Sequence, residues 1–322
     1  MNIAQKHSSE KTIAKNIRVA VDKANYDAAC KRLLSEKIIL AWIMKNCIQE
    51  YQDCEVNEIA EKYIEDKPQV AEVAVALDET NAASMIHGVA SEDTSMTEGT
   101  VTYDIRFIAA APVSGERIRL IINVEAQNDF YPGYPLVKRG LYYCSRMISA
   151  QYGTEFTESH YENIKKVYSI WICMNPPKNR KNSITCYHIT EENLVGRVKE
   201  KETDYDLMTT VMICLGKPED KQYMGVLKLL DVLLSTEINS AEKCRILETD
   251  FQIEMTQTLE SEVSLMCNLS KGVEEKGLIK GIQGMVSALK DLDIPDDTIL
   301  QKLQEKFNLT LEEAQRYLNH CQ

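Results

Sequence analysis

The sequence predicts an α/β fold with the order helix, strand, strand, strand, helix, strand, followed by a helical C-terminal appendage. Apolar residues at helical spacing predict helices over 33–48 and 135–151. Alternating or β-branched runs predict the strands, which lie over 69–77, 100–110, 117–127 and 167–174. A chain of 322 residues has room for one domain of ordinary-to-large size and a smaller one.

The domain boundaries follow from these elements. Residues 1–15 are polar and predict a flexible tail, and the α/β core is expected over 16–240. A connecting helix is predicted over 241–275, and residues 276–322 predict a small helical module. In that module Thr310 and Glu313 have the spacing of a capping box at the start of the last helix. Further expected elements are a hairpin turn at 111–115, a short strand near 85–89, a short helix at 58–63, strands at 183–189 and 207–215, and a helix at 224–234.

Charge, hydropathy and cysteine usage narrow the function. The net charge of −12 argues against polyanion binding by the whole surface, although a local basic face stays open. No apolar run approaches the roughly 18 residues that span a bilayer, and the N-terminus lacks the apolar core of a signal peptide. The 10 cysteines form no closely spaced pair, which is typical of reduced thiols. We therefore expect a cytoplasmic protein without membrane contact or a cysteine zinc site.

Three polar side chains mark the ends of two predicted strands. Glu125 and Gln127 follow an apolar run, and Asp104 lies in the preceding run. If the runs are neighbouring strands, two carboxylates and an amide meet and can hold a divalent metal against a phosphodiester. The plainer alternative is a strand end near solvent, although a strand this apolar predicts a buried edge. Glu36, placed one turn into the first helix, is either a further metal ligand or an exposed carboxylate.

Basic residues cluster directly after this site. Residues 130–181 hold eight bases against three acids, in a chain that is acidic elsewhere. Arginine suits phosphate because its planar fork donates two hydrogen bonds. The alternative is that the bases pair with this protein's own acids. The predicted DNA-binding residues are Lys138, Arg139, Arg146, Lys178, Arg180 and Lys181; the other two bases are Lys165 and Lys166.

These stretches resemble a known family. The segments at 103–107 (YDIRF), 122–127 (INVEAQ), 138–151 (KRGLYYCSRMISAQ) and 167–177 (VYSIWICMNPP) are similar to the recombination-promoting nuclease family, often labelled PD-(D/E)XK family transposases. The C-terminal segments MCNLSKGVEEKG and LTLEEAQRYL are similar to the tails of such proteins. The resemblance covers roughly residues 30–322. It implies a bacterial protein with a PD-(D/E)XK, restriction-endonuclease-like core.

The resemblance also implies an activity, which is metal-dependent DNA endonuclease cleavage in DNA recombination with Mg²⁺, or Mn²⁺ or Ca²⁺, as cofactor. Asp104 and Glu125 would be the catalytic acids that bind metal, and Glu36 would match the first-helix acid. Gln127 stands where the broader superfamily has lysine; it would orient the attacking water, with Arg139 or Lys138 supplying the cation. Two alternatives remain: a catalytically decayed DNA-binding or assembly protein on the same fold, and an interaction protein acting through its acidic C-terminus.

The C-terminal module has its own prediction. Residues 276–322 carry six basic and seven acidic residues, so they lack the clustered cations of a DNA reader. An apolar stripe follows the helical spacing and comprises Ile299, Leu300, Leu303, Phe307, Leu311, Tyr317 and Leu318. So small a module buries little surface alone. We therefore expect it to contact protein and to form a homo-oligomer, most simply a dimer.

Overall fold

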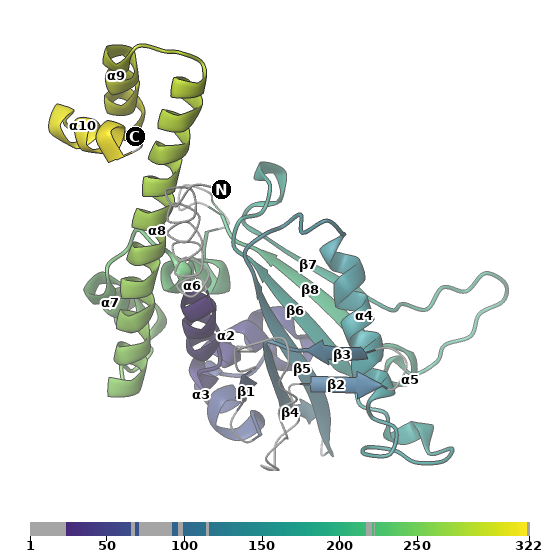
Figure 1. The fold of residues 1–322 in the computed structure, drawn as a ribbon. Coiled ribbons are helices and arrows are strands. Elements are labelled where there is room, and N and C mark those ends of the chain that lie inside the picture. Colours follow the sequence, from purple (N-terminus) through teal and green to yellow (C-terminus); the bar gives the residue numbers. More distant parts are fainter. Residues whose placement is uncertain are drawn as a thin grey trace. The chain divides into compact units, whose positions relative to one another are not determined.

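The structure is a computed structural model that describes residues 24–65, 68–70, 92–95, 99–113, 116–216, 221 and 223–320. The chain divides into two compact units. One is Asp27–Leu265, and the other combines Met1–Tyr26 with Met266–Gln322. Figure 1 labels the helices and strands.

A mixed six-stranded sheet is the centre of the first unit (Figure 1). In spatial order its strands are β1 (Gln69–Val70), β4 (Ile105–Val113), β5 (Glu116–Gln127), β6 (Val167–Cys173), β8 (Met208–Cys214) and β7 (Ser183–His188). The central strands β5, β6 and β8 run parallel, and the pairs β1–β4, β4–β5 and β7–β8 run antiparallel. All seven residues of β6 are buried, as expected for a central strand covered on both faces. The prediction of an α/β fold is confirmed at this level.

Helix α4 (Leu136–Ser149) connects the parallel strands β5 and β6 and covers one face of the sheet. Its buried side includes Tyr143, Cys144 and Met147, which pack with Trp171 of β6. Gly140 lets the helix come close, because a Cβ at this position would lie 2.5 Å from Cγ2 of Thr210 on β8. The predicted helix over 135–151 is confirmed, with its ends shifted inward by one or two residues.

The predicted first helix is two helices. Residues 24–34 are helical, and α2 (Lys37–Cys47) begins after a break at Ser35 and Glu36. The Ser35 hydroxyl donates to the Arg32 carbonyl at 2.7 Å, a local bond that competes with helix continuation. The placement of Glu36 one turn into a helix is therefore wrong: it is the N-cap of α2, with extended backbone. Short turns follow: η1 (Gln49–Tyr51), α3 (Val56–Glu58) and η2 (Ile59–Tyr63).

The strand predicted over 100–110 is also divided. β3 (Gly99–Thr102) pairs with β2 (Glu92–Ser95) in a separate two-stranded sheet, and β4 begins only at Ile105. The interruption coincides with Tyr103, whose buried ring meets that of Tyr143 edge-on at 5.3 Å. The predicted strand over 69–77 is described only to Val70. The predicted tail at 1–15 and the strand near 85–89 lie outside the described residues.

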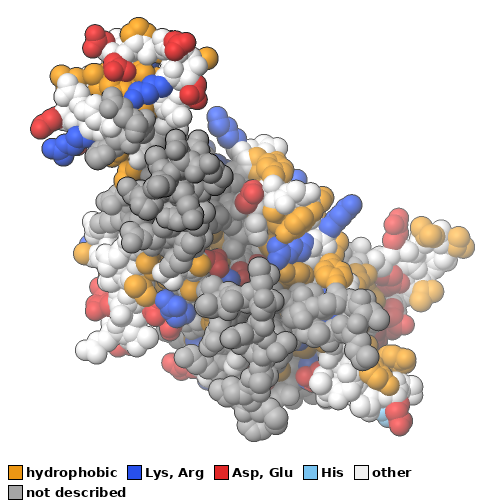
Figure 2. All heavy atoms as spheres, viewed as in Figure 1, with side chains coloured by type: hydrophobic (Ala, Val, Ile, Leu, Met, Phe, Trp, Pro, Cys, Tyr) orange, Lys and Arg blue, Asp and Glu red, His pale blue; other side chains and the backbone are white. Residues whose placement is uncertain are grey.

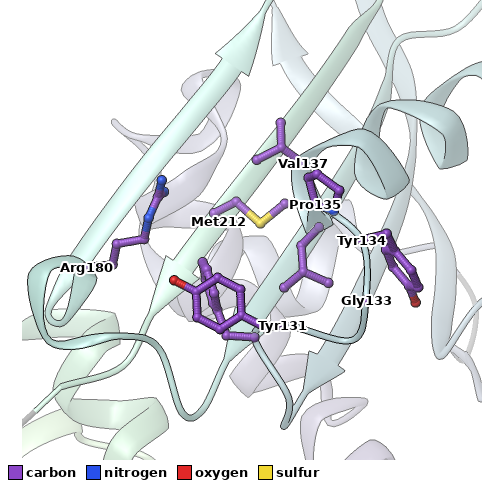
Figure 3. A pocket seen from close by; sticks show the side chains of 9 residues that line it. Tyr131, Gly133, Tyr134, Pro135, Val137, Arg180 and Met212 are labelled. Atoms are coloured by element: carbon purple, nitrogen blue, oxygen red, sulfur yellow. The ribbon is translucent and has the colours of Figure 1, made fainter.

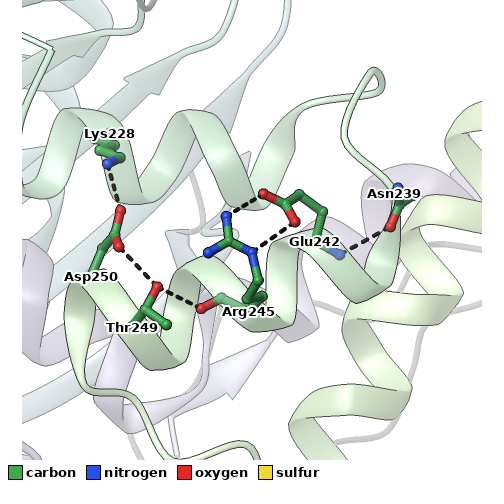
Figure 4. A network of polar contacts seen from close by, with 6 residues as sticks. All are labelled: Lys228, Asn239, Glu242, Arg245, Thr249 and Asp250. Carbon is green, nitrogen blue, oxygen red and sulfur yellow. Dashed lines mark hydrogen bonds and ion pairs between the residues drawn. The ribbon is translucent and has the colours of Figure 1, made fainter.

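The connecting helix predicted over 241–275 is likewise two helices, α7 (Ser240–Phe251) and α8 (Gln257–Asp291). α7 ends because Gln252 adopts a left-handed conformation, and α8 starts beyond Thr256, whose hydroxyl accepts from the Leu259 amide. Figure 4 shows the polar contacts of α7: the Asn239 side chain caps it, and Lys228 of α6 (Gly225–Leu234) pairs with Asp250. The other short helices are η3 (Tyr161–Asn163), η4 (Lys178–Arg180) and α5 (Glu202–Tyr205).

The second unit has a core of its own. The C-terminal part of α8 packs with α9 (Asp296–Phe307) and α10 (Leu311–His320) around Ile282, Val286, Ile299, Leu303, Ala314 and Leu318. The predicted capping box is confirmed: the Thr310 amide donates to Glu313 Oε2 at 2.9 Å, and the Glu313 amide donates to Thr310 Oγ1 at 3.3 Å. The expected boundary at 276 falls inside α8, so no helix starts there.

In the part of the chain that is described, no helix is both long enough and apolar enough to cross a membrane.

Candidate functional site

The structure brings Asp104 and Glu125 together. The antiparallel register of β4 and β5 pairs Ile105 with Val124. Asp104, which directly precedes Ile105, therefore lies opposite Glu125, which directly follows Val124. The Asp104 amide donates to Glu125 Oε1 at 3.1 Å, and the Ala126 amide donates to Asp104 Oδ2 at 3.2 Å. The predicted meeting of two carboxylates is therefore present, and two backbone amides fix its geometry.

Both carboxylates are withdrawn from solvent. Glu125 is 4% exposed and the side chain of Asp104 is 17% exposed. Burial raises the pKa of Asp104, while the charge and hydrogen bond of Lys31 act to lower it. Because a buried carboxylate is costly unless a cation or hydrogen-bond donors compensate its charge, this pair attracts cations.

Lys31 is the cation that the sequence reasoning missed. Its Nζ lies 2.9 Å from Asp104 Oδ1 and 2.7 Å from Asp27 Oδ2, and its side chain is 13% exposed. Burial acts to lower the pKa of Lys31, but the charge of Asp104 and the hydrogen bonds to both acids outweigh it and raise that pKa. The i, i+4 spacing of Asp27 and Lys31 is visible in the sequence, but no local pattern links Lys31 to Asp104, which lies 73 positions later.

Arg139 borders the site from α4. It donates from Nη1 to the Tyr134 hydroxyl at 2.8 Å and from Nε to the Tyr143 hydroxyl at 3.0 Å. Its guanidinium carbon lies 5.2 Å from the ring centroid of Trp171. Burial acts to lower the pKa of Arg139, but the Tyr143 hydrogen bond and the charges of Tyr143 and Glu125 raise it. Arg139 is thus a second, rigidly held cation within the field of the acid pair.

Gln127 and Glu36 are placed differently from the acid pair. The Gln127 amide nitrogen donates to the Asp129 carbonyl at 2.6 Å, so this side chain turns toward the loop after β5. Among the described residues no three histidine, cysteine, aspartate or glutamate side chains group closely enough to hold a metal. Glu36 is the N-cap of α2, and the contact between predicted metal ligands that the structure describes is that of Asp104 with Glu125. The roles of Glu36 and Gln127 stay predictions.

Two carboxylates suffice for one class of metal. Mg²⁺ is usually bound through one or two carboxylates, with water and substrate phosphate completing its shell. The oxygens of Asp104 and Glu125 are ligands of that class. Burial raises the pKa of Asp104 because it disfavours the charged carboxylate, and a cation beside it would stabilise that charged form. The residues present therefore fit a hard divalent cation.

The basic stretch divides into paired and exposed members. Lys165 pairs with Glu155, and Lys166 pairs with Asp206 at 2.6 Å and Glu50 at 3.4 Å, so for these two the self-pairing alternative is confirmed. Arg146 is 4% exposed and donates to the Tyr142 hydroxyl at 3.1 Å, which is not the setting of a surface phosphate contact. The remaining predicted residues vary in exposure: Lys138, Lys178 and Arg180 are exposed, and Arg139 and Lys181 are half-buried.

Figure 2 shows several Lys and Arg side chains at the surface on one face of the molecule, interspersed with apolar atoms.

Comparisons of the chain with protein-family models, with curated proteins and with solved structures found no significant match.

Proposed function

We propose that this protein is a metal-dependent DNA endonuclease that hydrolyses phosphodiester bonds. The observation that carries the proposal is the pair Asp104 and Glu125, held side by side at a buried strand edge by amide hydrogen bonds at 3.1 and 3.2 Å. Two adjacent carboxylates repel each other and lose hydration when they are buried, so the pair is costly unless cations and hydrogen-bond donors compensate it. A site that recruits a divalent cation and a phosphodiester explains why the two acids are there.

The arrangement of the sheet supports a PD-(D/E)XK core. In this proposal β1, β4 and β5 are its antiparallel strands, α4 is the connecting helix and β6 is the parallel strand that follows. Asp104 then directly precedes the second strand and Glu125 lies near the end of the third. This is the order in which the resembled family carries its two acids.

In the proposed reaction Asp104 and Glu125 would hold Mg²⁺, which when bound polarises the phosphate and makes a bound water more acidic. Arg139 binds a phosphate oxygen with its guanidinium, oriented by Tyr134 and Tyr143. The hydrogen bond from Gln127 to Asp129 fixes the amide, whose oxygen can then accept from the attacking water. Lys31 offsets the charge of Asp104 on the side of Asp27.

Plasmid cleavage tests the proposal. Purified wild type is incubated with supercoiled DNA in EDTA and in Mg²⁺, Mn²⁺ or Ca²⁺, beside Asp104→Ala and Glu125→Ala. We expect nicked or linear DNA with wild type and metal only, and none with either variant. Full cleavage activity in both variants would show that Asp104 and Glu125 do not form the active site.

A second candidate is a DNA-binding or assembly protein whose metal site has decayed. The ion pair between Lys31 and Asp104 favours it, because an ammonium 2.9 Å from the carboxylate already supplies the cation that the acid needs. The two candidates differ in metal affinity. Calorimetric titration of the intact protein with Mg²⁺ or Mn²⁺ should show binding that Asp104→Ala abolishes if the site is active, and no binding in any variant if it has decayed.

We propose a second copy of this chain as partner of the C-terminal module. Much of the predicted stripe is buried inside the module, because Ile299, Leu303 and Leu318 belong to its own hydrophobic core. Exposed apolar side chains remain at Leu292 and Leu311, which are 70% and 51% exposed. Light scattering of Leu292→Glu and Leu311→Glu tests the contact: a loss of mass relative to wild type supports it, and an unchanged mass contradicts it.

A further inference from the structure

A pocket opens beside the proposed site, within the first unit (Figure 3). The loop of residues 128–135, which follows Gln127 directly, supplies Phe130, Tyr131 and Tyr134. Arg180 lines the pocket from the turn between β6 and β7, and the buried Met212 lines it from β8. Its volume of about 430 Å³ falls within the roughly 300–1,000 Å³ of small-molecule sites.

The walls combine aromatic rings with one cation. Tyr131 is 71% exposed and Tyr134 is 45% exposed, although large aromatic side chains gain free energy from burial. The guanidinium carbon of Arg180 lies 5.7 Å from the ring centroid of Phe130. In Figure 3 Met212 lies between Arg180 and the segment that carries Pro135 and Val137. Flat apolar surfaces beside a guanidinium suit a flat, polarisable, uncharged ring next to an anion.

A hydrogen bond links the pocket to Arg139, the cation of the proposed site. Tyr134 lines the pocket, and its hydroxyl accepts from Arg139 at 2.8 Å. Arg139 in turn feels the charge of Glu125. Because Tyr134 belongs to the pocket and contacts Arg139, a nucleotide whose phosphate is held by Arg139 can extend its base into this pocket.

We propose that the pocket receives one unpaired nucleobase, stacked on Tyr131, of a strand whose neighbouring phosphate lies at Arg139. This rests on the proposed function, and it specifies the substrate as single-stranded or locally unpaired DNA. A base within an intact duplex is stacked between its neighbours and cannot enter without leaving the helix, which costs free energy. Stacking on an aromatic side chain tolerates any base, because every base has a flat face.

Binding to designed oligonucleotides tests the pocket. Fluorescence anisotropy in EDTA compares a thymidine strand of roughly 12 nucleotides, the same strand with abasic residues, and a duplex of equal length. The backbone charge of the first two is identical, so only the bases differ. We expect wild type to bind the thymidine strand about 5- to 150-fold more tightly than the abasic strand. Tyr131→Ala should reduce that ratio to near one, while Tyr131→Phe keeps it.

Tyr161→Ala is the matched control, because Tyr161 is 64% exposed and does not line the pocket. It should retain the wild-type ratio. Equal affinities of wild type for thymidine and abasic strands, or an unchanged ratio in a folded Tyr131→Ala variant, overturn the pocket. Base-dependent binding without cleavage in Mg²⁺ contradicts the nuclease proposal and supports the base-binding pocket. Cleavage without base-dependent binding supports the nuclease and contradicts the pocket. If neither cleavage nor base-dependent binding occurs, both proposals are wrong.

Discussion

Two lysines of the first unit each bridge a pair of carboxylates, yet their surroundings differ. Lys31 lies 2.7 and 2.9 Å from Asp27 and Asp104, and Lys166 lies 2.6 and 3.4 Å from Asp206 and Glu50. Their side chains are 13% and 16% exposed. A buried lysine between two carboxylates therefore occurs twice in this unit, on the segments that flank the sheet.

The difference lies in what else contacts the carboxylates. Around Lys166, Glu50 accepts from the Tyr168 hydroxyl at 2.6 Å and Asp206 accepts from the Ile189 amide at 3.3 Å. These contacts join η1 and two loops to the sheet, which is a structural role. Around Lys31 a further buried carboxylate, Glu125, lies against Asp104. The charge of Glu125 also acts on Arg139 and, against the effect of burial, raises the pKa of that guanidinium. The third carboxylate, in contact with Asp104, is what separates the two clusters, and in our proposal it marks a site that recruits a cation rather than an ion pair that supports the fold.

The largest expected effect separates the two clusters by activity. Asp104→Ala should lower cleavage by more than about 100-fold, the upper range for loss of a residue that merely supports a metal ligand. Asp206→Ala, assayed well below its unfolding temperature, should stay within about threefold of wild type, because Asp206 contacts no residue of the proposed site. Initial rates of supercoiled plasmid loss in Mg²⁺ measure both. Equal losses in the two variants would falsify the distinction.

Stability should show the opposite order. Asp206→Ala leaves Lys166 with only its longer contact to Glu50, so we expect a loss of about 3 kcal/mol, the lower end for breaking a buried ion pair. In Asp104→Ala the remaining pair of Lys31 with Asp27 persists, and removal of a buried acid relieves repulsion. Its loss should be smaller. Urea unfolding in EDTA gives both free energies of unfolding, and a larger loss in Asp104→Ala contradicts the assignment.

The pH dependence of Lys31→Met sharpens the comparison. Burial raises the pKa of Asp104 in the folded protein, so folding favours its protonated form. The stability that this group contributes is present below its ordinary pKa and is lost as pH rises through the raised value. Lys31 opposes that loss, because its charge favours the ionised carboxylate.

Replacing Lys31 by Met should therefore cost little near pH 4 and on the order of 1 kcal/mol more near pH 8. Added Mg²⁺ should recover stability in this variant by binding the folded state. Melting temperatures across pH, with and without Mg²⁺, measure both effects. A cost that does not change with pH means that Lys31 does not act through Asp104.

The helix that carries Arg139 offers a smaller test. Gly140→Ala would place a Cβ 2.5 Å from Thr210 Cγ2 and 3.0 Å from Trp171 Nε1. We expect a loss of about 1–3 kcal/mol from overpacking, and a lower DNA affinity as α4 moves Arg139 outward. The matched control Ser145→Ala lies on the exposed side of α4 and should change neither quantity beyond about 0.5 kcal/mol. Unfolding and anisotropy measurements on the same preparations check this.

The smallest effect concerns two lysines of the turn between β6 and β7. Neutralising Lys178 and Lys181 together should reduce the slope of log affinity against log salt by up to about 1.8 for duplex DNA, since each phosphate contact contributes about 0.9. Lys165→Gln is the control, because Lys165 already pairs with Glu155. An unchanged slope in the double variant shows that this turn does not contact DNA.

The elements with strong periodicity could be predicted from the sequence alone. β5, β6, α4 and α6 lie within a few residues of their predicted ranges because their apolar patterns leave little choice of conformation. The meeting of Asp104 and Glu125 was predicted on the condition that the two apolar runs are neighbouring strands, and the pairing of β4 with β5 meets that condition. The capping box at Thr310 was local chemistry and needed no tertiary information.

The cations beside the acid pair, and the positions where helices and strands end, could be learned from long-range contacts alone. Lys31 reaches Asp104 across 73 positions of sequence, and no periodicity links residues on different elements. Whether a base is exposed or paired, as for Lys178 and Lys166, depends on which acids the fold brings near. The interruption between β3 and β4 coincides with the contact of the Tyr103 ring with Tyr143 of α4. The left-handed conformation of Gln252 ends α7, so that a second helix, α8, follows it. Local pattern selects the element, but long-range packing selects where it stops and which charge it meets.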